Sequence, residues 1–358
     1  MVDGALSDVV VLELATGVAG PYCGKLFADL GARVDKIEPL TGDPIREEPP
    51  LVGGDSAFFN YLNANKQMQT LAISDPQIDE LAATATIVIH SELGAAADAL
   101  EARLRTANPA AIMLSLSPYG RTGERSAWQA SALTEWATGG YHYFGGDPNR
   151  EPIALPGFQT EFHAGLQAAV GVLAALWHLD ETGEGQRIEV SHQEAILSDH
   201  AWLTASWTHQ GKVQQRTGSI FAKCKDGYVY LFNLMPYPNL FILMERFDLL
   251  EDESRLSPIT WVQRFPEVLD ALSEWAATRT KQEIYHAAQE LRIAISPVNT
   301  MADIAASTQL AARDWFGEVE AAGQRFKAPG QPFKFSEPPD APTEASLETP
   351  LSLRSGRG

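Results

Sequence analysis

The chain has 358 residues, 45% of them hydrophobic, which is enough apolar material for two domains or for one large domain with an insertion. Its formal net charge of −19 argues against nucleic acid as a partner, because phosphate binding needs clustered Lys and Arg. The two cysteines, Cys23 and Cys224, have no metal or redox spacing, and the N-terminus has no signal-peptide pattern. We therefore expect a cytoplasmic protein that has no metal site and does not cross a membrane.

The first part of the chain predicts strands that alternate with helices, the pattern of a doubly wound α/β domain with a parallel sheet. Continuous apolar runs such as residues 9–14 are typical of strands buried on both faces. The predicted strands are 9–14, 32–38, 70–73, 86–90, 111–116 and 187–190. The predicted helices are 22–30, 95–105, 130–140, a long helix from about residue 160, and 193–208.

The sequence changes character after residue 208, and its pattern from there on predicts a smaller α+β domain at about 220–305. Pro297 lies in the last strand of this region, which makes it an edge strand because proline cannot donate to a sheet. The elements predicted here are a turn at 225–228, strands at 229–232 and 293–298, and helices at 236–247, 266–278 and 281–291. Beyond them we expect a helix at 309–316, a strand from Glu318 and an extended Pro-rich segment from Ala328.

The first strand–loop–helix unit imitates a dinucleotide-binding fingerprint without its glycine spacing. Gly17, Gly20 and Gly24 do not form G-x-G-x-x-G, and Pro21 lies inside the turn. Only the acidic residue after the second strand, Glu38, stands where such a motif would have one. A nicotinamide or flavin cofactor is therefore not expected.

The stretch 156–175 has the most informative pattern in the chain. A loop with Pro156 and Gly157 precedes a long apolar helix whose small residues recur every three or four positions, so that one face is nearly flat and a neighbouring backbone can approach it. Glu161 falls in the first turn, where the helix dipole favours a carboxylate, and Thr160 is a candidate N-cap. By themselves these features fit a solvated helix-end charge as well as a functional carboxylate.

Several short motifs occur along the chain in an order and spacing that are specific together. They are VVVLELATGVAGPYCGKLFADLGARVDKIEP near the start, GDPIR at 42–46, NANK at 63–66, YGRTG at 119–123, GLQAAVGVLAALW from Gly165, GEGQRIEVS at 183–191, SPVNTMADI at 296–304 and APGQPFKFSEPP at 328–339. In this order they resemble the class III CoA-transferase family, which includes formyl-CoA and carnitine CoA-transferases and the α-methylacyl-CoA racemases.

The resemblance implies a two-domain fold. The large Rossmann-like domain would combine residues 1–208 with 306–358, the small domain would span 220–305, and 209–219 would link them. It also implies an interlocked homodimer in which each chain is threaded through the other. A heteromer with an active homologue is the alternative if the chemistry of this chain is degraded.

The resemblance also implies a nucleophile. The family's transferases use an aspartate four residues before the glycine that opens the small-faced helix, and the residue four before Gly165 here is Glu161. Its carboxylate would attack a thioester carbonyl to form a mixed anhydride, and the released CoA thiolate would then form an enzyme-bound thioester for the acceptor acid to resolve. The glutamate reaches one methylene further than the aspartate, and misplacement on that scale can cost about 10²-fold in rate.

For the CoA site the resemblance implies five residues and no permanently bound cofactor, since CoA or acyl-CoA is the substrate. Val18 and Ala19 match positions whose backbone contacts the adenine end. Lys36, Arg46 and Lys66 match basic positions in or near the same groove, although each also fits an ordinary surface charge.

Other positions depart from the family pattern. Trp128 and Ala130 stand where the formyl-CoA enzymes have Lys and Tyr, and Ala130 also replaces the catalytic histidine of the racemases. His163 would point to a different side of the helix from Glu161, so we do not adopt it as a substitute base. CoA transfer between an acyl-CoA and a free carboxylic acid is the leading hypothesis. Proton transfer at the acyl α-carbon and a non-catalytic subunit are the alternatives.

Overall fold

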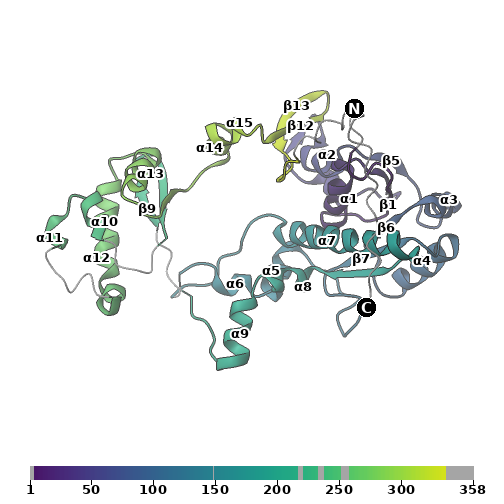
Figure 1. Ribbon diagram of the computed structural model, residues 1–358, viewed down its shortest axis with the longest axis horizontal. Coiled ribbons are helices and arrows are strands. Elements are labelled where there is room, and N and C mark those ends of the chain that lie inside the picture. Colours follow the sequence, from purple (N-terminus) through teal and green to yellow (C-terminus); the bar gives the residue numbers. More distant parts are fainter. Residues whose placement is uncertain (1–3, 148, 217–220, 233–237, 251–257, 336–358) are drawn as a thin grey trace, which may run out of the picture.

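The computed structural model describes residues 4–147, 149–216, 221–232, 238–250 and 258–335. Its centre is a six-stranded sheet in which all neighbouring strands are parallel (Figure 1). In sheet order the strands are β5 (Gln67–Thr70), β2 (Arg33–Glu38), β1 (Val10–Glu13), β6 (Ile87–His90), β7 (Ile112–Ser117) and β8 (Arg187–Ser191). This order, 3-2-1-4-5-6 by position in the chain, is that of the Rossmann fold. The predicted parallel α/β architecture is confirmed.

Helices cover both faces of this sheet. Alternate residues of the central strands belong to two separate cores, because successive side chains of a strand point to opposite faces. One core includes Val11 and Leu114 with α1 (Ala19–Asp29) and α7 (Gln159–Thr182). The other includes Leu12 with α3 (Pro76–Thr84) and α4 (Gly94–Ala107).

Three predicted boundaries in this region are wrong. The strand expected at 70–73 is β5, Gln67–Thr70, because it pairs with β2, which ends at Glu38. The helix expected at 193–208 is divided into α8 (His192–Ser198) and α9 (Ala201–Gln210). Pro21, expected in a loop, lies in the first turn of α1. The N–H group that proline lacks would have no intrahelical partner there, so the helix tolerates it. The remaining short elements of this region are η1 (Pro44–Glu47), β3 (Leu51–Val52), β4 (Asp55–Ser56), α2 (Ala57–Asn63), α5 (Ala132–Thr138) and α6 (Tyr141–Phe144).

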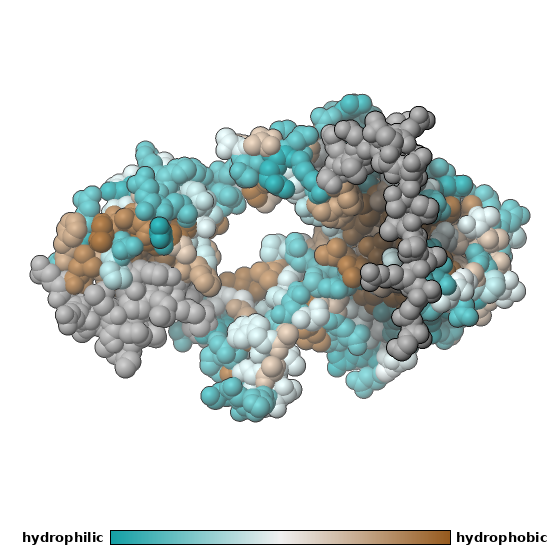
Figure 2. All heavy atoms as spheres, in the orientation of Figure 1, coloured by the Kyte–Doolittle hydropathy of each residue, from teal (hydrophilic) through white to brown (hydrophobic). Residues whose placement is uncertain are grey.

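A second, three-stranded sheet lies within residues 221–297, with Pro297 in its edge strand as predicted. It has its own core, and Figure 2 shows open space between this part and the large sheet. Its elements are β9 (Phe221–Cys224), β10 (Gly227–Leu231), α10 (Pro238–Leu243), α11 (Phe247–Leu250), α12 (Pro258–Ala276), α13 (Lys281–Glu290) and β11 (Ile295–Pro297). Helix α12 contains Pro266 rather than starting there. The domain limits themselves stay predictions, and parts of the linker 209–219 and of the helix 236–247 lie outside the described residues.

The last described segment returns to the large sheet domain (Figure 1). The chain passes through α14 (Met301–Ala305) and α15 (Thr308–Ala312) into the hairpin β12 (Phe316–Ala321) and β13 (Gln324–Pro329). Asn60 Nδ2 donates to Glu320 O at 3.1 Å, and Gln331 Nε2 donates to Asp29 O at 2.7 Å. The helix predicted at 309–316 therefore ends early, because Phe316 already belongs to the hairpin. Residues 336–358, in the predicted extended tail, lie outside the described residues.

Close packing of α7 on α1 depends on a glycine. A Cβ atom built at Gly165 would lie 2.5 Å from Ala19 O and 3.2 Å from Tyr22 Cδ1. The flat, small-residue face expected from the sequence is thus confirmed, and it faces the first turn of α1. By length and hydropathy α7 alone among the described helices could span a membrane, with 39% of the relevant window buried, and it packs on α1, α8, β7 and β8.

Buried charged side chains support the loop between β1 and α1. Lys36 Nζ and Lys66 Nζ lie 3.0 Å and 2.8 Å from the two carboxylate oxygens of Glu13, and none of the three side chains has exposed surface. Lys36 also donates to Ala15 O, and Lys66 donates to Pro21 O at 2.7 Å, so the lysines hold the start of the loop and the first turn of α1. Burial lowers the pKa of Lys66 to about 8, although Glu13 opposes this effect.

Gly165→Ala should destabilise the protein by about 1–3 kcal/mol, because the added methyl group has no room beside Ala19 O. Gly171→Ala in the same helix is the matched control. Its Cβ would lie 3.5 Å from Ile188 Cγ2, an ordinary contact, and alanine favours the helix by about 1 kcal/mol. Thermal unfolding of both variants measures the difference, and equal midpoints would contradict the close contact.

Lys66→Met should cost about 3 kcal/mol of unfolding free energy, since it leaves Glu13 buried with one counter-ion instead of two. Arg325→Met, which breaks an exposed pair with Glu318, should cost less than about 1 kcal/mol. Denaturant unfolding measures both values. A small effect of Lys66→Met would mean that the loop does not depend on this ion-pair network.

Candidate active site

A cavity of about 580 Å³ opens at the carboxyl ends of β1 and β6. Residues 16–20 after β1 and 91–93 after β6 line it, and so does the start of α7. Strand order reverses between β1 and β6, so the loops that follow them diverge, and ligands of open α/β sheets bind at such a point. The walls carry the carboxylates of Glu92, Glu135 and Glu161 and no Lys or Arg among the described residues.

The loop after β1 brings two predicted residues to this cavity. Gly17 has a positive φ of 81°, and its N–H donates to Asp43 Oδ1 at 3.2 Å. Val18 caps α1 and Ala19 begins it, and both line the cavity although their side chains are buried. Both residues thus lie at the cavity wall, and contact of their backbone with CoA stays a prediction.

Glu161 also lines the cavity, but its neighbour Thr160 does not cap α7. The N-cap is Phe158, which makes no side-chain cap hydrogen bond. The hydroxyl of Thr160 instead lies 2.7 Å from Glu161 Oε2 and 2.8 Å from Glu135 Oε2. Thr160 is fully buried, so this hydroxyl joins two carboxyl groups away from bulk water.

Two residues of the site were missed by sequence reasoning, Glu135 on α5 and His192 at the start of α8. His192 Nδ1 lies 2.8 Å from Glu135 Oε1, and its Nε2 is buried with no hydrogen-bond partner among the described residues. Both side chains line the cavity. The signals that could have found them are weak: Glu135 interrupts an apolar helix, and His192 directly follows a strand at the carboxyl edge of the sheet.

Burial is the main influence on Glu161. It raises the pKa of this carboxyl, and the negative charge of Glu135 raises it further. The hydrogen bond from Thr160 and the nearby His192 act in the opposite direction and are weaker. The sequence left the balance between helix dipole and desolvation open, and burial of Glu161 beside Glu135 favours the higher pKa. Glu161 is therefore easier to protonate than an exposed glutamate.

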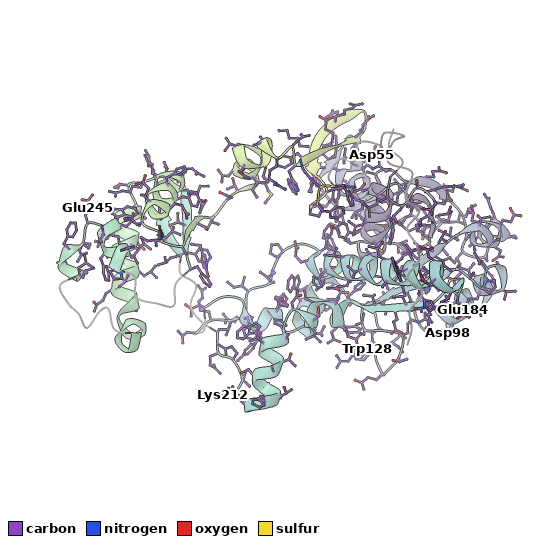
Figure 3. The ribbon with its side chains drawn as sticks, in the orientation of Figure 1. Asp55, Asp98, Trp128, Glu184, Lys212 and Glu245 are labelled. Carbon is purple, nitrogen blue, oxygen red and sulfur yellow. The ribbon has the colours of Figure 1, made fainter. Side chains whose placement is uncertain are left out.

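The three predicted cations do not line the cavity. Lys36 and Lys66 are the buried anchors of the loop. Arg46 is half-exposed, but it pairs with Glu38 at 2.5 Å and lies 4.0 Å from the centre of the Phe59 ring. The structure thus groups Val18, Ala19 and Glu161 in one cavity and places the three cations outside it. Trp128 is also outside, exposed on the large domain (Figure 3), whereas Ala130 lines the cavity.

The arginine of the motif at 119–123 has a supporting role. Arg121 pairs with Glu101 at 2.5 Å and with Asp98, and His90 Nε2 lies 3.0 Å from the same Glu101 carboxylate. Burial opposes ionisation of Glu101, but the hydrogen bonds from His90 and Arg121 hold its pKa at about 2. These contacts link helix α4, which follows β6, to the loop that follows β7. No group of three or more His, Cys, Asp or Glu side chains in the described part could hold a metal ion.

Two smaller hollows continue the cavity along the sheet edge. One of about 240 Å³ shares Thr16, Ser91 and Glu92 with it. Another of about 230 Å³ shares Glu92 with the cavity, shares Ile73 with the first hollow, and is bordered by Arg103. The shared residues place the three hollows next to one another, and Glu161 lines the largest of these three.

Known proteins show the same sequence pattern over nearly the whole chain. Residues 6–348 match CoA-transferase family III. The chain is 27% identical over 353 residues to the BbsE subunit of succinyl-CoA:(R)-benzylsuccinate CoA-transferase from Thauera aromatica, covering 90% of this chain and 86% of that protein. It is 29% identical over 372 residues to succinyl-CoA:mesaconate CoA-transferase from Haloarcula hispanica, covering 95% and 92%.

The fold has a counterpart among solved structures. The crystal structure of a CAIB/BAIF family protein from Brucella suis matches it with a TM-score of 0.82 and 24% identity, covering 94% of this chain and 93% of that chain. At this identity the likeness concerns the fold alone. Because the family match extends over residues 6–348, the chain belongs to CoA-transferase family III and is an enzyme of the transferase class.

Proposed function

We propose that this enzyme moves CoA between an acyl-CoA and a free carboxylic acid, with Glu161 as the nucleophile. The observation that carries the proposal is the position of Glu161, whose carboxyl lines the cavity together with Val18 and Ala19. The relatives named above are transferases that use succinyl-CoA, which supports CoA transfer in this family. The identity of the acyl group does not enter the proposal.

The reaction begins when a Glu161 oxygen attacks the thioester carbonyl. The C–S bond breaks, the CoA thiolate leaves, and a mixed anhydride forms. The thiolate then attacks the Glu161 carbonyl, which releases the first acid as its carboxylate and leaves CoA in thioester linkage to Glu161. The acceptor carboxylate attacks this thioester, and the thiolate attacks the acyl side of the new anhydride. The product is the second acyl-CoA, Glu161 is regenerated, and no proton is gained or lost overall.

The cavity suits this chemistry because its intermediates react with water. Phe158 and Leu116 line the cavity beside Glu161, and Phe162 and Tyr22 pack behind the helix end with ring centres 4.7 Å apart. These apolar side chains limit the access of water to an anhydride or a thioester on this side of the carboxyl group. The same wall raises the pKa of Glu161, so activity should fall at acid pH as this carboxyl becomes protonated.

We also propose a dimer, interlocked as the resemblance implies or formed with an active homologue. Helix α7 exposes four large apolar side chains at helical spacing, Leu166, Val170, Leu173 and Trp177. An apolar stripe of this kind marks a protein contact surface. A second subunit could also bring the Lys or Arg side chains that a CoA phosphate needs and that are not among the described residues lining the cavity.

A second candidate is proton transfer at the α-carbon of an acyl-CoA. The contact between His192 and Glu135 in the same cavity favours it, because a carboxylate that orients an imidazole is a common acid–base arrangement. Deuterium exchange at the acyl α-carbon without CoA transfer would support this candidate over the first.

Glu161→Gln should lower the transfer rate by at least about 10³-fold, since an amide cannot form the anhydride. CoA affinity, measured by calorimetry at low salt, should stay nearly the same. Glu161→Asp should lose about 10²-fold, because its shorter arm cannot keep the contact with Thr160 and still reach the same point. Hydroxylamine should trap an acyl-CoA-dependent adduct in the wild type only. Turnover that is unchanged in Glu161→Gln would overturn the mechanism, and no adduct with any acyl-CoA would support a non-catalytic subunit.

The wild type should sediment as a dimer at low micromolar concentration. Val170→Glu places a charge in the α7 stripe and should weaken the dimer by at least about 10-fold. Leu40→Glu, at an exposed apolar residue outside the stripe, is the control and should leave the dimer intact. A folded wild-type monomer at this concentration would contradict the proposal.

A further inference from the structure

Three polar contacts connect His192, Glu135, Thr160 and Glu161 in a row. His192 Nδ1 is 2.8 Å from Glu135 Oε1, and Glu135 Oε2 is 2.8 Å from Thr160 Oγ1. Thr160 Oγ1 is in turn 2.7 Å from Glu161 Oε2. The side chains come from three helices, α8, α5 and α7, and Glu135 and Thr160 are buried. Bulk water therefore cannot supply hydrogen-bond partners in the middle of the row.

A count of protons shows what this row requires. Each contact at such a distance needs one proton between its two atoms. His192 supplies the first through its Nδ1–H, which leaves Nε2 as a bare acceptor, in keeping with its lack of a partner among the described residues. Thr160 has one hydroxyl proton for the two remaining contacts. If both carboxyl groups were ionised, two oxygens would face each other with no proton between them.

We propose that Glu135 and Glu161 share one proton across the hydroxyl of Thr160, and that the position of this proton decides whether Glu161 is a nucleophile. The inference rests on the proposed function and deepens it. It makes Glu135 a positioning residue, which acts through Thr160 on the carboxylate that attacks the substrate.

The shared proton has two positions. On Glu135 Oε2 it is donated to Thr160, whose own proton is then donated to Glu161, and Glu161 is ionised and ready to attack. On Glu161 Oε2 the direction of both hydrogen bonds is reversed, and Glu161 is neutral. The change breaks one O–H bond on Thr160 and one on a carboxyl group and forms two in their place, so atoms and charge balance and no heavy atom moves.

Some neighbouring groups favour the proton on Glu135, and others favour it on Glu161. The first-turn N–H groups of α7 favour charge on Glu161, whereas the His192 N–H favours charge on Glu135. Glu92, on the loop after β6, lines the same cavity and disfavours either charge. Asp199, at the end of α8, lies 3.5 Å from the imidazole of His163 on α7, so this carboxylate is paired outside the row of four side chains. The raised pKa of Glu161 agrees with a carboxyl group that stays protonated at a pH above the ordinary pKa of glutamate.

A neutral Glu135 also serves the second half of the reaction. The acceptor is a carboxylate and must approach the thioester on Glu161, next to Glu135. A second buried negative charge there would repel it, since like charges at this range strongly disfavour each other. Holding the proton on Glu135 removes the charge next to the thioester, so that Glu92 is the carboxylate left among the described residues that line the cavity.

Variants of Thr160 and Glu135 test the proposal through the dependence of kcat/KM on pH. The quantity compared is the pH at which kcat/KM falls on the acid side, the acid limb. Glu135→Gln keeps an N–H donor towards Thr160 and removes the competing carboxyl, so the limb should move to lower pH by about one unit. Thr160→Val removes the bridge and leaves the carboxyl groups to repel each other, so the limb should move to higher pH. Thr160→Ser retains the hydroxyl and should keep the limb in place, whatever its rate. A purely structural role would change rate or stability without opposite shifts.

A second measurement does not need turnover. With ¹³C-labelled glutamate, infrared spectra of the wild type near neutral pH should show a buried protonated carboxyl that Glu135→Gln and Glu161→Gln both lose. If no acyl-CoA is turned over but this band behaves as expected, the proposed function fails and the shared proton stands. A wild-type spectrum without the band, or an acid limb that is the same in Thr160→Val and Thr160→Ser, would overturn the inference. The two threonine variants decide the matter if Glu135→Gln does not fold.

Discussion

The close contact between the second turn of α7 and the first turn of α1 is the constraint on which the candidate site depends. It exists because Gly165 has no Cβ atom to strike Ala19 O. Glu161 lies one turn before this glycine, so the contact fixes the distance between its carboxyl and the loop after β1. The parallel sheet determines where this happens, since the loops diverge where the strand order reverses.

The same domain stabilises buried carboxyl groups in two different ways. Beneath the loop, Glu13 has two lysine partners, and the cluster holds the backbone at Ala15 and Pro21. Among the described residues that line the cavity there is no Lys or Arg, and the side chains that hydrogen-bond to Glu135 and Glu161 are the hydroxyl of Thr160 and the imidazole of His192. Ion pairs suit a support that must not change. A carboxyl that must gain and lose charge during a reaction needs weaker partners.

Much of the fold could be predicted because its signals are local. The apolar runs of β1, β6 and β7 are buried on both faces and stand out in the sequence, and the small residues of α7 mark the face that packs. Errors occur where a partner decides the boundary. Strand β5 ends at Thr70 because β2 ends at Glu38, and no property of residues 70–73 carries that information.

For the site, the sequence by itself determined that a carboxylate stands in the first turn of a small-faced helix and that a glycine loop follows the first strand. Both facts follow from spacing along one segment. Only the tertiary structure decided that Lys36 and Lys66 are internal anchors, that Thr160 bridges two carboxyl groups instead of capping its helix, and that burial raises the pKa of Glu161. The physical reason is that burial and hydrogen bonding depend on partners distant in sequence, here on α5 and α8, which come together only when the helices pack.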